Sequence, residues 1–269
     1  MIDIALGFRN ADGEMLNELV HCLDFMNGLP FFKAYKAHTW ETLKIGSGQK
    51  ILDVACGIEF DVIEMAIRFP SADFWGLDSS EGFLEIAKSR AGNLTNVKFL
   101  QGNGDRHPLP LPENEFDGVR IDRSLQHMKD PHSAIKEMVR VTRPEGHLVA
   151  AEPDWETFVL YNGDLDIGAK LAKQFKGSIR NPYVGRELGM IFTKCGVVNP
   201  QCNIHAFCTT DFKCATVVFD LARVRDRCIQ LGILRSEDAH RWWLASEEAS
   251  ERGIFFASLN IVEFSGVIS

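Results

Sequence analysis

Two neighbouring stretches decide the fold: KILDVACGIEFD at residues 50–61 and FWGLD at residues 74–78. The first reads as a buried apolar strand, a tight turn and the start of a helix. Ala55 and Gly57 leave room at the turn for a ligand to approach the backbone, and the first amides of the helix are available to it. The second stretch reads as a strand ending in Asp78, where a carboxylate can accept two hydroxyls of a ribose. Together they predict a nucleoside-cofactor site in a doubly wound sheet.

Composition and charge narrow the class of protein. The chain has 269 residues, 29 Lys and Arg against 37 Asp and Glu, and a net charge of −8. It has no basic field for a polyanion, so we expect neither a nucleic-acid partner nor a membrane partner. Seven scattered cysteines without metal-ligand spacing predict reduced thiols, no metal site and a cytoplasmic location. No apolar run reaches the roughly 18 residues of a membrane span.

The order of strand and helix patterns predicts an α/β fold. We expect a Rossmann-like, doubly wound, mostly parallel sheet of about seven strands with an antiparallel last strand. Helices precede the sheet, and others form a lid inserted between the last two strands. The strands are expected at residues 51–54, 74–77, 97–100, 116–121, 147–151, 201–209 and 255–267.

The domain organisation follows from the same patterns. We expect residues 1–269 to form a single domain. Within it, residues 1–47 are expected to be an N-terminal helical cap and residues 48–152 the cofactor-binding core. Residues 153–269 are expected to form the acceptor side, with the helical lid and the final strands.

The turn after the first strand distinguishes between cofactors. A pyrophosphate binder needs the pattern G-x-G-x-x-G, whereas Gly57 is the one glycine in this window. Asp53, Glu59 and Asp61 make the turn acidic, which would repel a pyrophosphate. An acidic turn suits a ligand that carries an amine and a sulfonium, and S-adenosylmethionine fits that description.

Several motifs in order resemble those of the class I S-adenosylmethionine-dependent methyltransferases, particularly the small-molecule branch with the ubiquinone and menaquinone enzymes. They are DVACG at 53–57, Asp78, PLPENEFD at 110–117, LQH at 125–127 and RVTRPEG at 140–146, within residues 31–195. The resemblance implies that the loop backbone holds the methionine part of the cofactor, that Asp78 holds the ribose and that Asn103 and Gly104 flank the adenine, with Asp105 as the alternative to Asn103. The predicted cofactor-binding residues are Tyr35, Asp53, Ala55, Cys56, Gly57, Asp78, Ser79, Asn103, Gly104, Asp105 and Asp122.

One departure from the family pattern concerns Glu59, which stands where relatives usually have glycine. Turned inward, its carboxylate would compete with the carboxylate of the cofactor at the helix N-terminus. Turned outward, or bound to the cofactor's amine, it would leave binding intact.

The reaction itself needs few protein groups, because the cofactor carries an activated methyl group. His127 and Asp122 are the candidate catalytic residues, with His127 as the general base. His127 could instead cap the helix that starts near Pro131, and Asp122 and Arg123 could be solvated loop charges. Tyr35 could cover the cofactor or be an ordinary core aromatic.

Three further groups of residues could have either a functional or a purely structural role. Residues 152–155 could enter the site or form a turn, and residues 180–186 could bind an acidic acceptor or end a helix. Trp242 and Trp243 could shape an acceptor pocket or pack a helix.

The sequence therefore predicts methyl transfer from S-adenosylmethionine to a small organic acceptor by in-line displacement, with a homodimer as the candidate assembly. Two alternatives remain open. The chain could bind the cofactor weakly or not at all and act as a binding or regulatory subunit, or it could catalyse a non-methylating reaction such as a cyclisation.

Overall fold

The computed structural model describes residues 8, 11–12, 15–58, 60–105 and 107–269. Its centre is a seven-stranded sheet in the order β3-β2-β1-β4-β5-β7-β6. The first five strands in this order run parallel, and β7 is antiparallel to both of its neighbours. The predicted sheet is thereby confirmed. The strands are β1 (Lys50–Val54), β2 (Asp73–Asp78), β3 (Val97–Gln101), β4 (Phe116–Asp122), β5 (Thr142–Tyr161), β6 (Val197–Thr209) and β7 (Phe256–Ile268).

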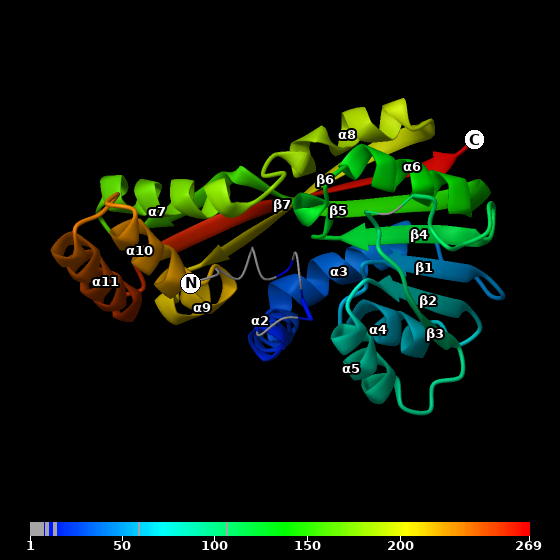
Figure 1. Cartoon of the computed structure of the whole chain (residues 1–269), viewed down its shortest axis with the longest axis horizontal. Coiled ribbons are helices and arrows are strands. Elements are labelled where there is room, and N and C mark those ends of the chain that lie inside the picture. The colour runs from blue at the N-terminus through cyan, green and yellow to red at the C-terminus, as the bar shows by residue number, and fades with distance from the viewer. Residues whose placement is uncertain (1–7, 9–10, 13–14, 59, 106) are drawn as a thin grey trace.

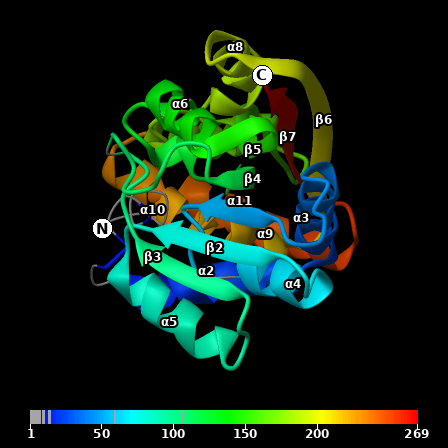
Figure 2. The ribbon, with the colours of Figure 1, turned by 90° about the vertical axis from the view of Figure 1, so that its right-hand side faces the viewer.

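Helices cover both faces of the sheet (Figures 1 and 2). One face carries α3 (Pro30–Thr42), α4 (Phe60–Arg68) and α5 (Glu81–Ala91), and the other carries α6 (Pro131–Val141) and α8 (Val184–Lys194). Alternate side chains of the strands point to opposite faces and build two separate cores. Ile51 packs with α3 and α4, whereas Leu52 packs with α6 and α8.

The strand order places a ligand-binding edge between β1 and β4. From β1 the chain proceeds outward to β2 and β3, and it then returns to the other side of β1 as β4. The connections on the two sides of this point leave the sheet in opposite directions, which opens a crevice at the carboxyl ends of the strands. The motif at residues 53–57 and Asp122 both end strands at this edge.

The last three strands extend beyond the parallel part of the sheet and support a helical lobe (Figure 1). α2 (Leu16–Gly28) and α7 (Leu165–Ser178) pack there. Between β6 and β7 the chain forms α9 (Phe212–Val218), α10 (Leu221–Gln230) and α11 (Ser236–Glu251), so the predicted insertion between the last two strands is confirmed. No helix among the described residues combines the length and apolarity that crossing a membrane requires.

One local expectation was wrong. β5 continues to Tyr161 instead of ending at Ala151: beyond the pairing of Asp122 with Ala151 it has lost β4 as a neighbour, so Pro153 does not interrupt a ladder on that side. The left-handed backbone of Asp220 (φ 48°) separates α9 from α10. α11 begins at Ser236, and Arg235 is its N-cap residue.

Candidate active site

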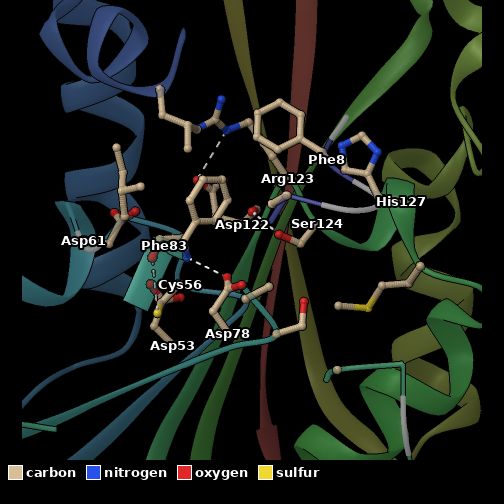
Figure 3. A pocket seen from close by; sticks show the side chains of 18 of the residues that line it. Phe8, Asp53, Cys56, Asp61, Asp78, Phe83, Asp122, Arg123, Ser124 and His127 are labelled. Atoms are coloured by element: carbon tan, nitrogen blue, oxygen red, sulfur yellow. Dashed lines mark hydrogen bonds and ion pairs between the residues drawn. The ribbon is translucent and has the colours of Figure 1, made fainter. Parts of the chain in front are cut away.

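A polar cavity of about 470 Å³ lies at the carboxyl ends of β1, β2 and β4 (Figure 3). Its size lies within the range of small-molecule sites. Most of the predicted cofactor-binding residues line it. These are Asp53, Ala55, Cys56, Gly57, Asp78, Ser79, Asn103, Gly104, Asp105 and Asp122.

The turn after β1 is held open by its backbone and by Asp78. Ala55 and Gly57 both adopt left-handed backbone angles, with φ of 57° and 61°. A Cβ placed on Gly57 would meet no atom within 4 Å, so the backbone is open to a ligand there. The Gly57 N–H donates to Asp78 Oδ2 at 2.8 Å, and the Ser80 N–H donates to Oδ1 at 2.9 Å. Burial raises the pKa of Asp78, and these amides oppose that rise.

The turn after β3 forms a second wall of the cavity. The Asp105 N–H donates to Asn103 Oδ1 at 2.8 Å, and the Lys129 N–H donates to Asp105 Oδ1 at 2.6 Å. A Cβ on Gly104 would lie 2.7 Å from the Met128 methyl group, so any larger residue here would displace the end of the Met128 side chain. Asn103 and Asp105 therefore both line the cavity, and Asp105 also ties its turn to the segment after β4.

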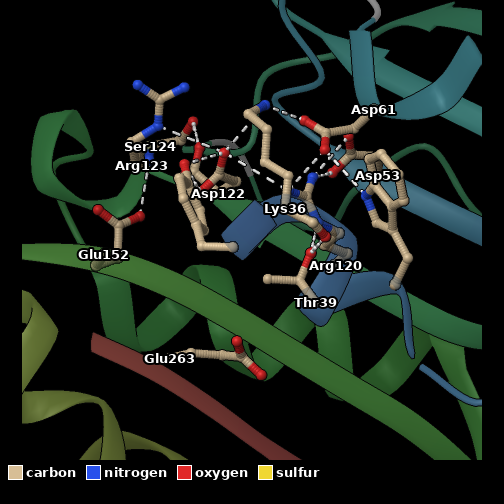
Figure 4. A network of polar contacts seen from close by, with 12 residues as sticks. Lys36, Thr39, Asp53, Asp61, Arg120, Asp122, Arg123, Ser124, Glu152 and Glu263 are labelled. Carbon is tan, nitrogen blue, oxygen red and sulfur yellow. Dashed lines mark hydrogen bonds and ion pairs between the residues drawn. The ribbon is translucent and has the colours of Figure 1, made fainter. Parts of the chain in front are cut away.

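The floor of the cavity is a buried ionic network (Figure 4). Arg120 contacts both oxygens of Asp53 through Nη1, at 3.0 and 3.1 Å, and Asp61 Oδ1 through Nη2 at 3.0 Å. Its Nε donates to Thr39 Oγ1 at 2.8 Å. Trp40 Nε1 donates to Asp61 at 3.0 Å. The motif acid Asp53 is thus largely committed to the protein, and its role toward a ligand is to fix the turn.

Asp122 joins the same network from the end of β4. The Tyr35 hydroxyl donates to it, 3.0 and 3.1 Å from its two oxygens, and Lys36 Nζ lies 3.4 Å from Oδ2. Lys36 also pairs with Asp61. Burial acts to raise the pKa of Asp122, but the charges of Arg123, Lys36 and Arg120 outweigh it and hold the pKa at about 2. An ionised, well-paired carboxylate is a weak base, so Asp122 is suited to contact the cofactor or the acceptor and not to remove a proton; its catalytic role stays a prediction.

Tyr35 is the predicted cofactor-binding residue that does not appear in the wall of the polar cavity. Tyr35 is buried behind Asp122, packs against Phe31, Phe32 and His205, and does not line either cavity described here. The core-aromatic reading is the one that fits it. Glu59 falls outside the described residues.

Phe8, Ala11 and Asp12, here called the N-terminal arm, are described residues ahead of α2 that lie beside the cavity. Phe8 lines it, and its ring stacks on the His127 ring with centroids 5.6 Å apart (Figure 3). The Asp12 carboxylate accepts hydrogen bonds at the start of α5 from the Ser80 hydroxyl and from Gly82 N–H at 3.0 Å. An aromatic contact and a helix cap thus attach this arm over the site.

A second cavity, of about 70 Å³, adjoins the first on the side of the helical lobe. Apolar and aromatic side chains form most of its wall. They include Phe32, Trp155, Phe175, Phe207, Phe219 and Leu259. The two cavities share Phe8, Met26, Arg123, Gln126 and His127, so they meet beside the segment that follows β4.

That segment, which contains the 3₁₀ turn η1 (Leu125–His127), is positioned by one buried carboxylate. Glu152 accepts hydrogen bonds from the N–H groups of Ser124 at 2.7 Å, Leu125 at 2.6 Å and Gln126 at 3.3 Å. Burial raises the pKa of Glu152 to about 8, and the three amides oppose the rise. Glu152 therefore positions η1 from behind the cavities instead of entering them.

The other polar residues near η1 also hold its backbone. Asn181 Nδ2 donates to the carbonyls of Leu125 and Met128 at 2.9 and 2.7 Å, and Arg180 Nη1 donates to the His127 carbonyl at 3.0 Å. Trp155 Nε1 donates to Gln126 Oε1 at 2.7 Å. Of residues 152–155, Pro153 and Trp155 reach the apolar cavity.

His127 projects from this fixed turn into both cavities. Its alternative reading as a helix cap is wrong, because Asp130 caps α6 by accepting from the Ser133 N–H. Trp242 and Trp243 pack against Phe212 and line neither cavity, which fits the packing reading. Sequence reasoning missed Lys36 and Arg120, which have no local motif, and it also missed the aromatic wall.

Comparisons with known proteins agree with this geometry. A family model described as a methyltransferase domain matches residues 45–186. The chain belongs to this family. Its resemblance to class I S-adenosylmethionine-dependent methyltransferases is thereby confirmed.

Two relatives illustrate the range of similarity. An uncharacterized 37.1 kDa protein of a Streptomyces fradiae transposon is 32% identical over 231 residues, covering 85% of this chain and 65% of that protein. A demethylmenaquinone methyltransferase of Staphylococcus epidermidis is 32% identical over 163 residues, covering 56% of this chain and 67% of the enzyme. The chain thus spans about two thirds of the length of these relatives.

Solved structures share the fold. A Haemonchus contortus phosphoethanolamine N-methyltransferase in complex with S-adenosylhomocysteine aligns with a TM-score of 0.62 at 16% identity, covering 97% of this chain and 59% of that one. The [4+2]-cyclase SpnF aligns with a TM-score of 0.55 at 19% identity, covering 88% and 81%. At these identities the likeness concerns the fold alone.

The residues of the polar cavity fit S-adenosylmethionine. Asp78 lines the cavity, and each of its carboxylate oxygens accepts a hydrogen bond from one backbone N–H. Each oxygen keeps a lone pair that can accept a hydrogen bond from a ribose hydroxyl. The open backbone at Gly57 leaves space for the amino-acid part of the cofactor. Phe83 and Ile58 supply apolar wall for a base.

Proposed function

We propose that this protein transfers the methyl group of S-adenosylmethionine to a small acceptor with an apolar body. The observation that carries the proposal is the meeting of two unlike cavities at Arg123, Gln126 and His127. The polar cavity would hold the cofactor, and the aromatic cavity would hold the apolar part of the acceptor. The reacting atom of the acceptor would then face the shared residues.

Residues of the first cavity would orient the cofactor. Asp78 would accept the ribose hydroxyls, and the backbone of Ala55–Gly57 would face the amino-acid part. When bound, the cofactor supplies a methyl group activated by its sulfonium centre. The three cations and three carboxylates of the floor (Lys36, Arg120, Arg123, Asp53, Asp61 and Asp122) balance in formal charge, so the floor adds no net charge beneath it.

The second cavity limits the acceptor by size and chemistry. Its volume of about 70 Å³ is about half that of a cavity known to hold benzene, so it suits an alkyl group or the edge of a ring. A charged head group would be desolvated there among Phe175, Phe207 and Phe219 without a partner, which is unfavourable. The acceptor would therefore be apolar at the end that enters first.

His127 would take the proton that the acceptor loses. It lines both cavities, and η1 is held by Glu152 and Arg180, so its position beside the reacting atom would be well defined. Burial of the acceptor between Phe8 and the aromatic wall would exclude water from the reaction.

The test is methyl transfer from labelled S-adenosylmethionine to alkylphenols and alkylanilines, with phosphoethanolamine as the charged comparison. We expect S-adenosylhomocysteine and methylated product with the alkyl acceptors. Leu259→Phe would fill the aromatic cavity and abolish turnover while leaving S-adenosylhomocysteine binding intact, and the exposed Leu244→Phe would change neither.

Three results would reject the proposal. Methylation of phosphoethanolamine but not of the alkyl acceptors would contradict the apolar acceptor. Conversion of an acceptor without S-adenosylhomocysteine would indicate a non-methylating reaction. Full activity of Leu259→Phe would show that the aromatic cavity does not hold the acceptor.

A further inference from the structure

A second group of chemically active side chains lies outside both cavities, where α3 crosses the outer strands. His38 of α3, His205 of β6 and Glu263 of β7 bring two imidazole nitrogens and a carboxylate oxygen within 4.8 Å of one another. His38 Nδ1 is 2.9 Å and His205 Nε2 is 2.7 Å from the same oxygen, Glu263 Oε2. None of the three lines the cofactor cavity or the aromatic cavity.

The surroundings hold this group in place. Glu263 lies in β7 between Ala151 of β5 and Asn203 of β6, and its side chain is 0% exposed. The Thr42 hydroxyl lies 3.1 Å from Glu263 Oε1, so the second oxygen is also fixed (Figure 4 labels Glu263). The rings of His38 and His205 meet edge to face with centroids 5.1 Å apart. A buried carboxylate of β7 thus faces one imidazole from α3 and one from β6.

We propose that His38, His205 and Glu263 bind a divalent transition-metal ion, with Zn²⁺ as the reference ion. Two imidazoles and one carboxylate are a ligand set that Zn²⁺ uses when it has three protein ligands. Thr42 supplies the outer hydrogen bond that orients the carboxylate. The His38 side chain is 42% exposed, so water can reach the remaining coordination position.

The change in geometry on binding is small. Zn²⁺ bonds of about 2.0–2.2 Å in a tetrahedral site place neighbouring donor atoms roughly 3.3–3.6 Å apart. The two N···O distances of 2.9 and 2.7 Å therefore need to widen by roughly 0.4–0.9 Å. His38 is partly exposed and can provide much of this movement by turning its ring.

The site would clamp α3 to the outer strands. α3 also carries Tyr35 and Lys36, which contact Asp122 and Asp61 at the floor of the cofactor cavity. The metal would thus stabilise the helix that supports the floor without touching the reacting groups. This inference does not depend on the proposed methyl acceptor.

Metal binding is tested by titrating the full-length protein, freed of metal, with ZnCl₂ by calorimetry and with CoCl₂ by visible absorption. We expect one equivalent of Zn²⁺ and a rise in melting temperature. His38→Ala and His205→Ala would weaken binding by at least about 100-fold and remove that rise, because each loses one of three ligands. The exposed His240→Ala is the matched control and would bind like the unaltered protein.

The Co²⁺ spectrum distinguishes this site from the thiols. Cys202 and Cys208 are exposed, and a thiolate ligand would add a charge-transfer band in the near ultraviolet. Histidine and carboxylate ligands give the visible bands without it. The proposal is overturned if Zn²⁺ does not bind stoichiometrically, if binding survives in both histidine variants, or if the bound Co²⁺ shows a thiolate band. Glu263 is buried in the sheet, so its replacement would disturb the fold. The test therefore uses His38→Ala, at a partly exposed position.

Discussion

Arg120 in β4 contacts both carboxylate oxygens of Asp53 in β1, directly beneath the cofactor cavity, at 3.0 and 3.1 Å. The side chains are 1% and 3% exposed, and the same guanidinium also reaches Asp61. The pair links β1 to β4, the two strands between which the ligand-binding crevice opens. The rigidity of the cofactor turn therefore depends on a buried charge cluster that no local sequence motif reveals.

Replacing Arg120 with alanine should destabilise the protein strongly. Asp53 and Asp61 would be left in the interior without their main counter-charge, a change that typically costs about 3–5 kcal/mol. Urea denaturation followed by circular dichroism measures the loss. Arg235→Ala removes a guanidinium whose side chain is 76% exposed and should leave the free energy of unfolding unchanged. Equal stability of the two variants would contradict the role of the cluster.

Glu152 should make stability depend on pH. Burial raises its pKa to about 8 in the folded protein, against 4.5 as the ordinary value. Between these values the folded state binds more protons than the unfolded state, so this group's contribution to stability falls as the pH rises from about 5 to 8. Comparing the unfolding free energy of the protein with that of Glu152→Gln across this range isolates the effect.

We expect Glu152→Gln to gain in relative stability as the pH rises, because the amide keeps an acceptor for η1 and cannot ionise. Glu237→Gln, at an exposed position of α11, is the control and should show no such trend. A stability difference that stays constant from pH 5 to 8 would show that Glu152 does not titrate in this window.

His127→Ala should lower kcat by about 10²–10⁴-fold if the histidine takes the acceptor's proton. The KM for S-adenosylmethionine should stay nearly unchanged, because other residues would hold the cofactor. The fall in kcat on the acid side of the pH–rate profile should disappear in the variant. His132→Ala, on α6, serves as the control. Unchanged kcat and an unchanged profile in His127→Ala would exclude it as the base.

The N-terminal arm should contribute to cofactor affinity. Phe8→Ala removes a ring that lines the cofactor cavity and stacks on His127, so we expect roughly fivefold weaker binding from the lost cavity wall. Asp12→Ala should act in the same direction by releasing the arm from α5. S-adenosylhomocysteine titrations measure both, with Asp24→Ala on the exposed surface of α2 as the control. Affinities equal to that of the unaltered protein would show that the arm does not close the site.

The order of strands and most of the cofactor cavity could be predicted from the sequence because their signals are local. A buried strand, a turn with small residues and an acid at the next strand end lie within residues 50–78. The sheet topology then brings Asp78 and the turn at 102–105 together without further information. His127 is also found this way, since it follows β4.

The remaining features depend on contacts between distant residues. Lys36 and Asp61 are 25 residues apart, and Arg120 is 67 residues from Asp53, so nothing in their spacing indicates a shared network. His38 and Glu263 are 225 residues apart, which is why the sequence predicts no metal site. The length of β5 depends on its pairing with β7, which continues beyond Ala151 after β4 has ended, and no local signal shows this pairing.

Calorimetric titration with S-adenosylhomocysteine tests the cofactor site most directly. We expect binding of one equivalent to the unaltered protein and to Asp166→Asn, whose carboxylate lies on the exposed surface of α7. Asp78→Asn should bind roughly 10–100-fold more weakly, because charge-assisted hydrogen bonds to the ribose would be lost. Absence of binding to the unaltered protein, or equal affinity for Asp78→Asn, would contradict the assignment of this cavity as the cofactor site.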